Sequence, residues 1–282
     1  MRHTPAATRA VLVTSLVLAA ALPAVADTPS ARIVGGHPSP DRSYAVSIQL
    51  TYQGNPNFHL CGGTLISRDA VVTAGHCVEA SIGAPPITAL HVRIGSRDNT
   101  RGFSARVIAA ASNAFDPVAM TNDIAVLKLD RHMPLLPALI GHTPTTPGTA
   151  VTATGWGRTT PDNTGPTSRM LMQATVSTLP AQACAAGQIS AAEMCAQGVQ
   201  GVGVCGGDSG SGLMQHIGTS RWEVLVGLSS RTGGSAEPPR CGQSPDIYTD
   251  VAAHKRWIYT TALALGAQAP RTTAEVPELP GR

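Results

Sequence analysis

Residues 206–212 read Gly-Gly-Asp-Ser-Gly-Ser-Gly, which places Ser209 directly after Asp208 in a run of glycines. Glycine permits the tight turns that hold a hydroxyl at an open surface with backbone N–H groups beside it. Acyl transfer needs both features, because the nucleophile must be activated and the oxyanion must meet waiting donors. Short Gly/Ser/Asp runs are also common as ordinary turns, so this hypothesis requires a base and an acid elsewhere in the chain.

Two other segments supply candidates for the base and the acid. Thr73-Ala74-Gly75-His76-Cys77 offers an imidazole directly after an apolar, β-like run. Asn122-Asp123-Ile124-Ala125-Val126-Leu127 places a carboxylate at the start of another such run, where burial without a partner would be costly. A histidine N–H is one suitable partner. A serine, an imidazole and an orienting carboxylate can together perform nucleophilic catalysis.

The N-terminus has the pattern of a secretory signal peptide. Two arginines precede an apolar run over residues 10–25, and Ala24-Val25-Ala26 is a small-x-small cleavage site. We therefore expect residues 1–26 to be removed and the mature chain to be secreted and extracellular. An uncleaved membrane anchor is the weaker alternative, because the run is short for a span and Pro23 interrupts it.

The six cysteines agree with export to an oxidising environment. They are Cys61, Cys77, Cys184, Cys195, Cys205 and Cys241. Their even number predicts full pairing, while the sequence alone leaves the connectivity open. Metal binding is the rival interpretation, but it requires clustered ligands such as Cys-x-x-Cys, and the chain has no such pair. We therefore expect neither a metal nor a cofactor.

The formal net charge of +3 falls to +1 when residues 1–32, with three arginines and one aspartate, are removed. No dense Lys/Arg run remains, so we expect no nucleic-acid partner. No later apolar run approaches the roughly 20 residues of a membrane span, so we expect no membrane partner either. The low charge and the composition, rich in Ala, Gly, Pro and Thr, indicate a secreted protein of bacterial origin.

Short β-like runs separated by turn residues recur through the body of the chain. They are residues 44–51, 64–66, 70–73, 90–94, 124–129, 150–153, 171–179 and 224–228. Val, Ile, Thr and Leu dominate these runs, which favours a sandwich or barrel over βαβ units. A stretch rich in Thr and Pro at residues 142–148 divides the mature chain into halves of similar size and is typical of a linker.

One helix is expected near the C-terminus, where Asp250 can cap an apolar face formed by Val251, Trp257, Ile258 and Ala262. Residues 267–282 contain three prolines and have no hydrophobic periodicity. We therefore predict that this last segment is a disordered tail.

Together the motifs resemble those of the chymotrypsin-like (trypsin-type) serine peptidases, and the resemblance runs from Ile33 to about Ala264. The order His, Asp, Ser separates this family from subtilisins and α/β-hydrolases. Five motifs stand in the family order: Ile33-Val34-Gly35-Gly36, Thr73-Ala74-Gly75-His76-Cys77, Asp123-Ile124-Ala125-Val126-Leu127, Gly155-Trp156-Gly157 and Gly207-Asp208-Ser209-Gly210. The resemblance implies an all-β fold of two antiparallel six-stranded barrels, over residues 33–146 and 147–266, with a C-terminal helix.

The resemblance also implies a role for each residue of these motifs. Ser209 would be the nucleophile, His76 the base, and Asp123 the acid that orients the imidazole. The backbone N–H groups of Gly207 and Ser209 would form the oxyanion hole. Ser230 would lie on the strand that pairs with the backbone of an extended polypeptide substrate.

The resemblance also leads to expectations about disulfide bonds and calcium. The resemblance implies the pairs Cys61–Cys77, Cys184–Cys195 and Cys205–Cys241. Some members of this family bind calcium at the loop that corresponds to residues 95–104. Because Asp98 is the only acid in this loop, we expect no calcium site there.

Residues 27–32 lie between the signal cleavage site and Ile33, and the resemblance makes them an activation propeptide. Cleavage after Arg32 would free the amine of Ile33, which would insert beside Asp208 and order the oxyanion turn. Because a buried carboxylate without a cation is disfavoured, we expect the uncut precursor to be nearly inactive.

The specificity pocket departs from the trypsin pattern. Trypsins carry an aspartate six residues before the nucleophile, whereas this chain has Gly203 there, followed by Val204. Asp246 corresponds to a pocket-wall position that is usually glycine, and a carboxylate there would attract Arg or Lys. Thr232 stands where glycine commonly leaves room for long side chains, and Arg231 adds a positive charge on the same edge.

The sequence therefore predicts a secreted serine endopeptidase, a monomer that cuts extended polypeptides after Arg or Lys and that can meet protein inhibitors. Cleavage after medium-sized apolar residues, with Asp246 turned to solvent, is the alternative specificity. Two other function classes remain open. A catalytically silent binding module would usually lack a member of the triad, and an esterase would be expected to carry a Gly-x-Ser-x-Gly elbow.

Overall fold

The computed structural model describes Met1 and residues 33–217, 222–235 and 240–275. The predicted signal peptide beyond Met1 and the predicted propeptide with Arg32 lie outside the described residues. Contacts group residues 31–282 into a single unit, which is the part of the chain described below.

Six antiparallel strands close the first barrel, in the order β2-β3-β4-β7-β6-β5. Their bounds are β2 (Ala45–Tyr52), β3 (Asn55–Leu65), β4 (Ala70–Thr73), β5 (His91–Ile94), β6 (Phe103–Ser112) and β7 (Ala125–Leu129). Alternate side chains of these strands fill the interior, among them Val46, Ile48, Leu65, Val71 and Leu127. Burial of this apolar surface, worth roughly 25 cal/mol for each Å², is the main force that holds the barrel together.

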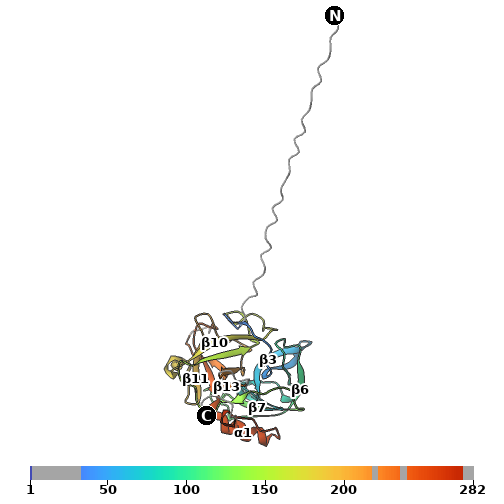
Figure 1. Ribbon diagram of the computed structural model, residues 1–282, viewed down its shortest axis with the longest axis vertical. Helices are drawn as coiled ribbons and strands as arrows, with labels where there is room; N and C mark the ends of the chain where they lie inside the picture. Colours follow the sequence, from blue (N-terminus) through green and yellow to red (C-terminus); the bar gives the residue numbers. More distant parts are fainter. Residues whose placement is uncertain (2–32, 218–221, 236–239, 276–282) are drawn as a thin grey trace. The chain divides into compact units, whose positions relative to one another are not determined.

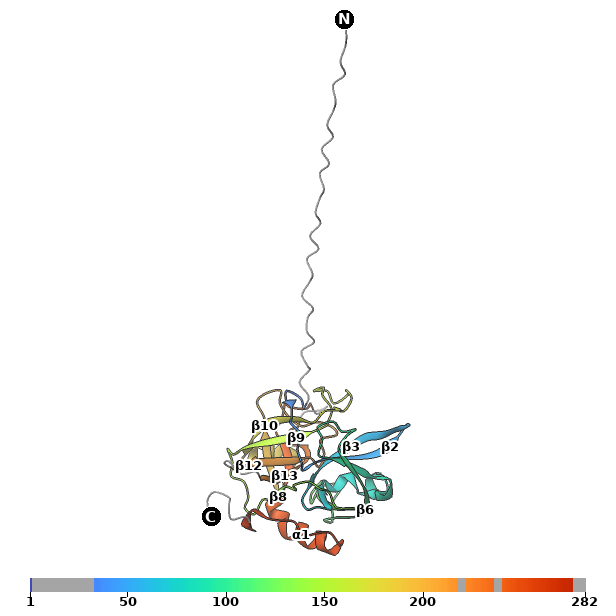
Figure 2. The ribbon, with the colours of Figure 1, turned by 45° about the vertical axis from the view of Figure 1, so that its right-hand side comes forward.

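Six further strands close a second barrel, in which β9 pairs with both β10 and β12. Their bounds are β9 (Ala150–Gly155), β10 (Met172–Leu179), β11 (Glu193–Gln197), β12 (Gly212–His216), β13 (Glu223–Thr232) and β14 (Asp246–Asp250). A short strand, β8 (Leu139–Ile140), adds to β13 in parallel. The two barrels lie side by side in both views (Figures 1 and 2). The predicted all-β fold of two six-stranded barrels is thus confirmed.

The two ends of the described chain cross between the barrels. Strand β1 (His37–Pro38) pairs with β10 of the second barrel, although the sequence assigned this segment to the first. The C-terminal helix α1 (Val251–Ala264) follows β14 and packs its buried face, including Ile258, against β7 of the first barrel and β13 of the second (Figure 1). Asp250 caps α1 as predicted, accepting hydrogen bonds from the backbone of Ala252 and Ala253.

The short 3-10 helices lie in the connections between strands. They are η1 (Gly75–Cys77), η2 (Ala80–Ile82), η3 (Ile87–Ala89), η4 (Ala181–Gly187) and η5 (Thr273–Glu275). Among the described residues, none of the helices is both long and apolar enough to cross a membrane.

The prediction of disorder after residue 266 is wrong for residues 267–275. Gln268 N donates a 2.8 Å hydrogen bond to the buried carboxylate of Asp69, and the carbonyl of Arg271 accepts one of 2.9 Å from Ile140 N. The guanidinium of Arg271 also lies 5.0 Å from the centre of the Trp222 ring. Single backbone and cation–π contacts therefore hold this segment, and such contacts leave no periodic pattern in the sequence.

Three disulfide bonds are present, and they join the pairs that the resemblance implies. Cys61–Cys77 ties β3 to η1, Cys184–Cys195 ties η4 to β11, and Cys205–Cys241 closes the longest loop. Each bond restricts the unfolded chain, which in the loop-entropy model stabilises the fold by roughly 3 kcal/mol. The Cys61–Cys77 bond also fixes the backbone beside His76.

Candidate active site

The structure brings Asp123 and His76 together through two hydrogen bonds. Asp123 Oδ2 lies 2.9 Å from His76 Nδ1, and Asp123 Oδ1 accepts a 2.9 Å hydrogen bond from His76 N. His76 lies in η1, shortly after β4, and Asp123 stands two residues before β7, which pairs with β4. The pairing of these two strands therefore sets the distance between the acid and the base, and the double contact fixes the orientation of the imidazole.

Asp123 is completely buried, yet its environment favours the ionised form. Burial raises the pKa of its carboxyl, but hydrogen bonds from His76 and from Ser230 Oγ, at 2.6 Å, bring that pKa below its ordinary value. Thr249 Oγ1 donates to the backbone carbonyl of Asp123 at 2.8 Å. Ser230, predicted as a residue of the substrate strand, therefore also holds the acid.

The turn that carries Ser209 packs against the residues just before His76. Ser209 O accepts a 2.8 Å hydrogen bond from Gly62 N and lies 3.9 Å from Cys77 Sγ. Gly210 has a φ of +74°, and a Cβ at this position would lie 2.2 Å from Thr73 Oγ1. Only glycine fits this backbone and this close approach, so the Gly in the serine motif brings the turn up to the histidine.

A buried histidine that sequence reasoning missed holds the proposed oxyanion turn. His59 Nε2 lies 2.9 Å from Gly207 O, and His59 Nδ1 lies 2.7 Å from Ser47 Oγ. Burial lowers the pKa of His59 to about 4, so the ring is neutral. Because a carbonyl oxygen can only accept, Nε2 carries the proton. Nothing in the sequence distinguishes this histidine from an ordinary residue of β3.

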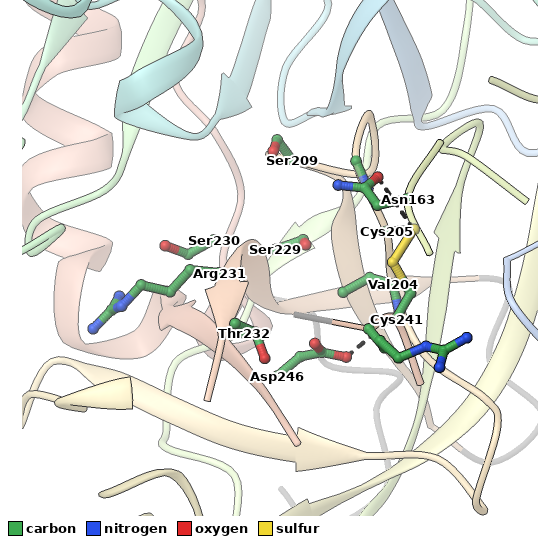
Figure 3. Close-up of a pocket in the computed structure, with 12 residues that line it drawn as sticks. Asn163, Val204, Cys205, Ser209, Ser229, Ser230, Arg231, Thr232, Cys241 and Asp246 are labelled. Atoms are coloured by element: carbon green, nitrogen blue, oxygen red, sulfur yellow. Dashed lines mark hydrogen bonds between the residues drawn. A yellow bond between two sulfur atoms is a disulfide. The ribbon is translucent and has the colours of Figure 1, made fainter. Parts of the chain in front are cut away.

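A cavity of about 170 Å³ opens beside Ser209 (Figure 3). Four of the predicted pocket residues line it: Val204, Ser230, Thr232 and Asp246. The fifth, Gly203, lies behind its wall, since a Cβ there would come within 3.1 Å of Asp246 Oδ2. The absence of a side chain at Gly203 thus leaves the space that the carboxylate of Asp246 occupies.

Asp246 does not turn to solvent. Its side chain is buried in the pocket lining, and its Oδ2 accepts a long hydrogen bond, 3.4 Å, from Val204 N. Burial raises the pKa of Asp246 to about 8, and the nearby carboxyl of Asp208 adds to this rise. The carboxyl group in the free pocket is therefore mostly protonated at neutral pH.

Arg231 does not bring its charge to the pocket, contrary to expectation. Its guanidinium pairs with the buried carboxylate of Glu193, including a 3.1 Å contact between Nη2 and Oε2, and donates to Met120 O at 3.1 Å. Figure 3 shows this side chain directed away from Asp246. The positive charge of Arg231 is thus neutralised by Glu193 and not by Asp246.

Asp208 is buried next to the pocket. Its Oδ1 accepts a 2.7 Å hydrogen bond from Gly157 N, and its Oδ2 accepts one of 2.9 Å from Cys205 N. Burial raises the pKa of Asp208 to about 7, and among the described residues no cation pairs with it. Ile33 is also buried, against Met172 of the strand that pairs with β9 near Gly157. A buried acid and the predicted new N-terminus thus share one region of the second barrel.

The loop of residues 95–104, considered for calcium, uses its single acid in another way. Asp98 accepts two hydrogen bonds from the guanidinium of Arg169, of 3.1 and 2.7 Å, and one from Thr100 Oγ1. The pKa of Asp98 lies well below its ordinary value because of these contacts. The carboxylate therefore joins the two barrels in an ion pair.

A family model described as Trypsin matches residues 33–258. The chain belongs to the trypsin family. It is 31% identical to trypsin iota of Drosophila melanogaster over 249 residues, which is 83% of this chain and 90% of that trypsin. It is also 31% identical to human serine protease 56, covering 85% of this chain but only 40% of that larger protein. The near full-length match to trypsin iota identifies a serine endopeptidase, a trypsin-like hydrolase of polypeptides.

A solved structure agrees with this fold. Human heparin binding protein matches with a TM-score of 0.65 and 26% sequence identity, covering 84% of this chain and 99% of that one. These three relatives are animal proteins, so they give no support to a bacterial origin.

Proposed function

We propose that the mature chain is a secreted endopeptidase that cleaves peptide bonds with a triad of Ser209, His76 and Asp123. The double hydrogen bond between Asp123 and His76 is the observation that carries this proposal. A carboxylate that is buried, ionised and bound to Nδ1 leaves Nε2 as the nitrogen that accepts a proton. The serine turn packed beside the histidine then supplies the hydroxyl.

In this mechanism each proton has a defined place. Ser209 Oγ attacks the scissile carbonyl while His76 Nε2 takes the hydroxyl proton, and Asp123 stabilises the imidazolium that forms. The N–H groups of Gly207 and Ser209 stabilise the oxyanion, each worth about 3 kcal/mol in the transition state. His76 then protonates the leaving amine, and water hydrolyses the acyl-enzyme by the same steps in reverse.

The end of β13 is suited to bind an extended polypeptide. This strand pairs with β12 from Glu223 to Leu228 and with β14 from Gly227 onward, so at Arg231 and Thr232 it pairs with β14 alone. The free edge of residues 230–232 borders the pocket, so a substrate strand can add there and direct one side chain into the cavity.

Cleavage after Arg or Lys is the specificity that we propose. Asp246 is supported in this role by its burial and by the absence of a cation paired with it among the described residues. An arginine or lysine side chain in the pocket would favour the ionised form of this carboxyl and form an ion pair with it. Because the empty pocket favours the protonated acid, medium-sized apolar side chains remain the competing class.

We further propose that the protein is made as a zymogen, activated by cleavage after Arg32. The carboxyl of Asp208 is buried and has no cation as a partner in the part of the chain that the structure describes. This supports the proposal, because the freed amine of Ile33 would supply its cation. Secretion, a monomeric state and recognition by protein inhibitors are proposals that rest on the sequence and the family.

The first experiment is to label the cut protein with a sulfonyl fluoride and to measure hydrolysis of peptide amides that differ only in the residue before the cut. We expect labelling at Ser209 and cleavage of the amide. Absence of labelling would favour a silent binding module, and labelling without amide cleavage would favour an esterase.

Replacing Asp246 by asparagine should lower the ratio of kcat/KM for an arginine substrate to that for a leucine substrate by about 30- to 100-fold. For the unmodified enzyme, kcat/KM with the arginine substrate should rise with pH through about 8, the pKa of Asp246 in the free pocket. The leucine substrate serves as the internal control. An unchanged ratio in the Asp246→Asn protein would overturn the acidic-pocket proposal.

A further inference from the structure

A loop outside the triad contacts the residue that precedes the oxyanion glycine. The loop of residues 158–167 begins and ends at an antiparallel bridge between Arg158 and Thr167. Cys241 N binds Pro161 O at 2.9 Å, and Arg158 Nη1 binds Asn163 O at 2.9 Å, so the loop has a defined shape. Nothing in the mechanism above assigns it a function.

Two contacts from this loop hold Gly206 at both of its backbone polar groups. Gly206 O accepts a 2.7 Å hydrogen bond from Arg158 N. Gly206 N donates a 3.0 Å hydrogen bond to the side-chain oxygen of Asn163. The same oxygen lies 3.4 Å from Cys205 Sγ, and Figure 3 shows Asn163 beside Cys205 near the pocket.

These contacts determine where the N–H of Gly207 points. The carbonyl of Gly206 and the N–H of Gly207 belong to one planar, trans peptide, so they point in opposite directions. Fixing the carbonyl through Arg158 N therefore fixes the N–H. The bond to Asn163 fixes the preceding peptide plane, and His59 holds the following one through Gly207 O. Two successive glycines would otherwise leave this backbone free to rotate.

Asn163 also occupies the space that a side chain at position 206 would need. A Cβ on Gly206 would lie 2.4 Å from Asn163 Oδ1, so a side chain at position 206 would displace that of Asn163. Gly206 therefore leaves the space in which Asn163 accepts its hydrogen bond. Asn163 itself has a φ of +58°, a conformation that asparagine and aspartate tolerate better than other residues with side chains. The glycine and the asparagine are thus a matched pair, 43 residues apart in the sequence.

We propose that Asn163 is a positioning residue for the oxyanion hole, acting through Gly206 on the N–H of Gly207. The inference rests on the proposed protease function and deepens it. This role requires Asn163 Oδ1 as the acceptor of the hydrogen bond from Gly206 N, and it does not require the amide nitrogen. The substitution that removes the oxygen and the one that removes only the nitrogen should therefore differ.

The test compares three variants of the cut enzyme. Asn163→Gly keeps the backbone freedom of this position but removes the acceptor, and we expect kcat to fall roughly three- to tenfold with little change in KM. Asn163→Asp keeps an oxygen acceptor and should retain kcat. Asp162→Asn, at the adjacent exposed residue, is the matched control and should behave as the unmodified enzyme.

Inhibitor binding separates positioning from a merely structural effect. A peptide aldehyde forms an adduct whose oxyanion needs the N–H of Gly207, whereas a small aromatic amidine fills only the pocket. In Asn163→Gly the aldehyde should bind roughly three- to tenfold more weakly, and the amidine should bind as before. Equal loss for both ligands, or for neither, would overturn the proposal.

A second substitution tests the matched pair directly. Gly206→Ala should lower kcat, because its methyl group displaces the side chain of Asn163. Adding Asn163→Gly relieves that clash, so the double variant should lose less than the product of the two single losses. Strictly multiplicative losses would count against the proposal.

The failure of this inference can be told apart from the failure of the proposed function. If the unmodified cut enzyme neither hydrolyses peptides nor reacts with a sulfonyl fluoride, the proposed function fails. An active enzyme that is insensitive to Asn163→Gly rejects only this inference.

Discussion

Replacement of Asp123 by asparagine is expected to lower kcat by about 10⁴-fold while leaving the fold intact. The side chain of Asp123 faces three donors: His76 N, His76 Nδ1 and Ser230 Oγ. A carboxylate accepts from all of them, but an amide must turn its NH₂ group toward at least one. If the NH₂ faces Nδ1, the imidazole proton moves to Nε2, which then can no longer accept the proton of Ser209.

The measurement is single-turnover acylation with a peptide ester, together with thermal unfolding to verify that the variant is folded. Asp116→Asn is the matched control, because Asp116 is an exposed acid whose oxygen caps Val118 N and Ala119 N, a task that asparagine can also perform. We expect the control to keep full activity. A loss of less than tenfold in a folded Asp123→Asn protein would rule out the triad.

The sequence predicts the strands whose own composition favours β structure. The Val/Ile-rich runs over residues 70–73 and 124–129 correspond closely to β4 and β7, since their side chains are buried on both faces. The sequence did not predict β6, because this strand contains three successive alanines. It did not predict β14 either, because aspartates stand at both ends of that strand. These two strands form because neighbouring strands pair with them, which is a tertiary cause.

In the candidate site, too, some residues could be predicted from the sequence and others could not. The positions of His76, Asp123 and Ser209 could be predicted because each stands in a motif that needs its own local backbone. The partners of the site could not. Asn163 lies in a stretch that has the composition of an ordinary turn, and Glu193 becomes buried only because Arg231 neutralises it across the sheet. Contacts between residues about 40 positions apart leave no local pattern to find.

The uncut precursor should be at least 10²-fold, and up to about 10⁴-fold, less active in kcat/KM than the cut enzyme. Without the amine of Ile33, the buried carboxyl of Asp208 has backbone N–H groups as its partners among the described residues. Leaving a buried charge without its partner costs about 3–5 kcal/mol. We expect this cost to loosen the turn that carries Gly207 and Ser209, since Asp208 lies between them.

An Arg32→Gln protein, whose N-terminus is verified as uncut by mass spectrometry, provides the measurement. Arg32→Lys is the matched control, since a protease specific for basic residues can still cut this protein after residue 32. After that cut the Arg32→Lys protein should have full activity. Acetylating the Ile33 amine of the cut enzyme should abolish the activity gained by cleavage. Full activity in the uncut Arg32→Gln protein would exclude a zymogen mechanism.

The pH dependence of the two forms supplies an independent check on the same ion pair. In the uncut form burial raises the pKa of Asp208 to about 7, so this carboxyl makes the fold less stable as pH rises from its unfolded pKa of about 4 to about 7, and the loss is complete above that pH. In the cut form the ammonium of Ile33 pairs with Asp208, which lowers the pKa of the acid and raises that of the amine. The stability from a raised amine pKa is complete below its unfolded value of about 8 and is lost as pH rises through the folded value. The cut enzyme should therefore lose activity reversibly at alkaline pH, and an acetylated or uncut protein should show no such transition.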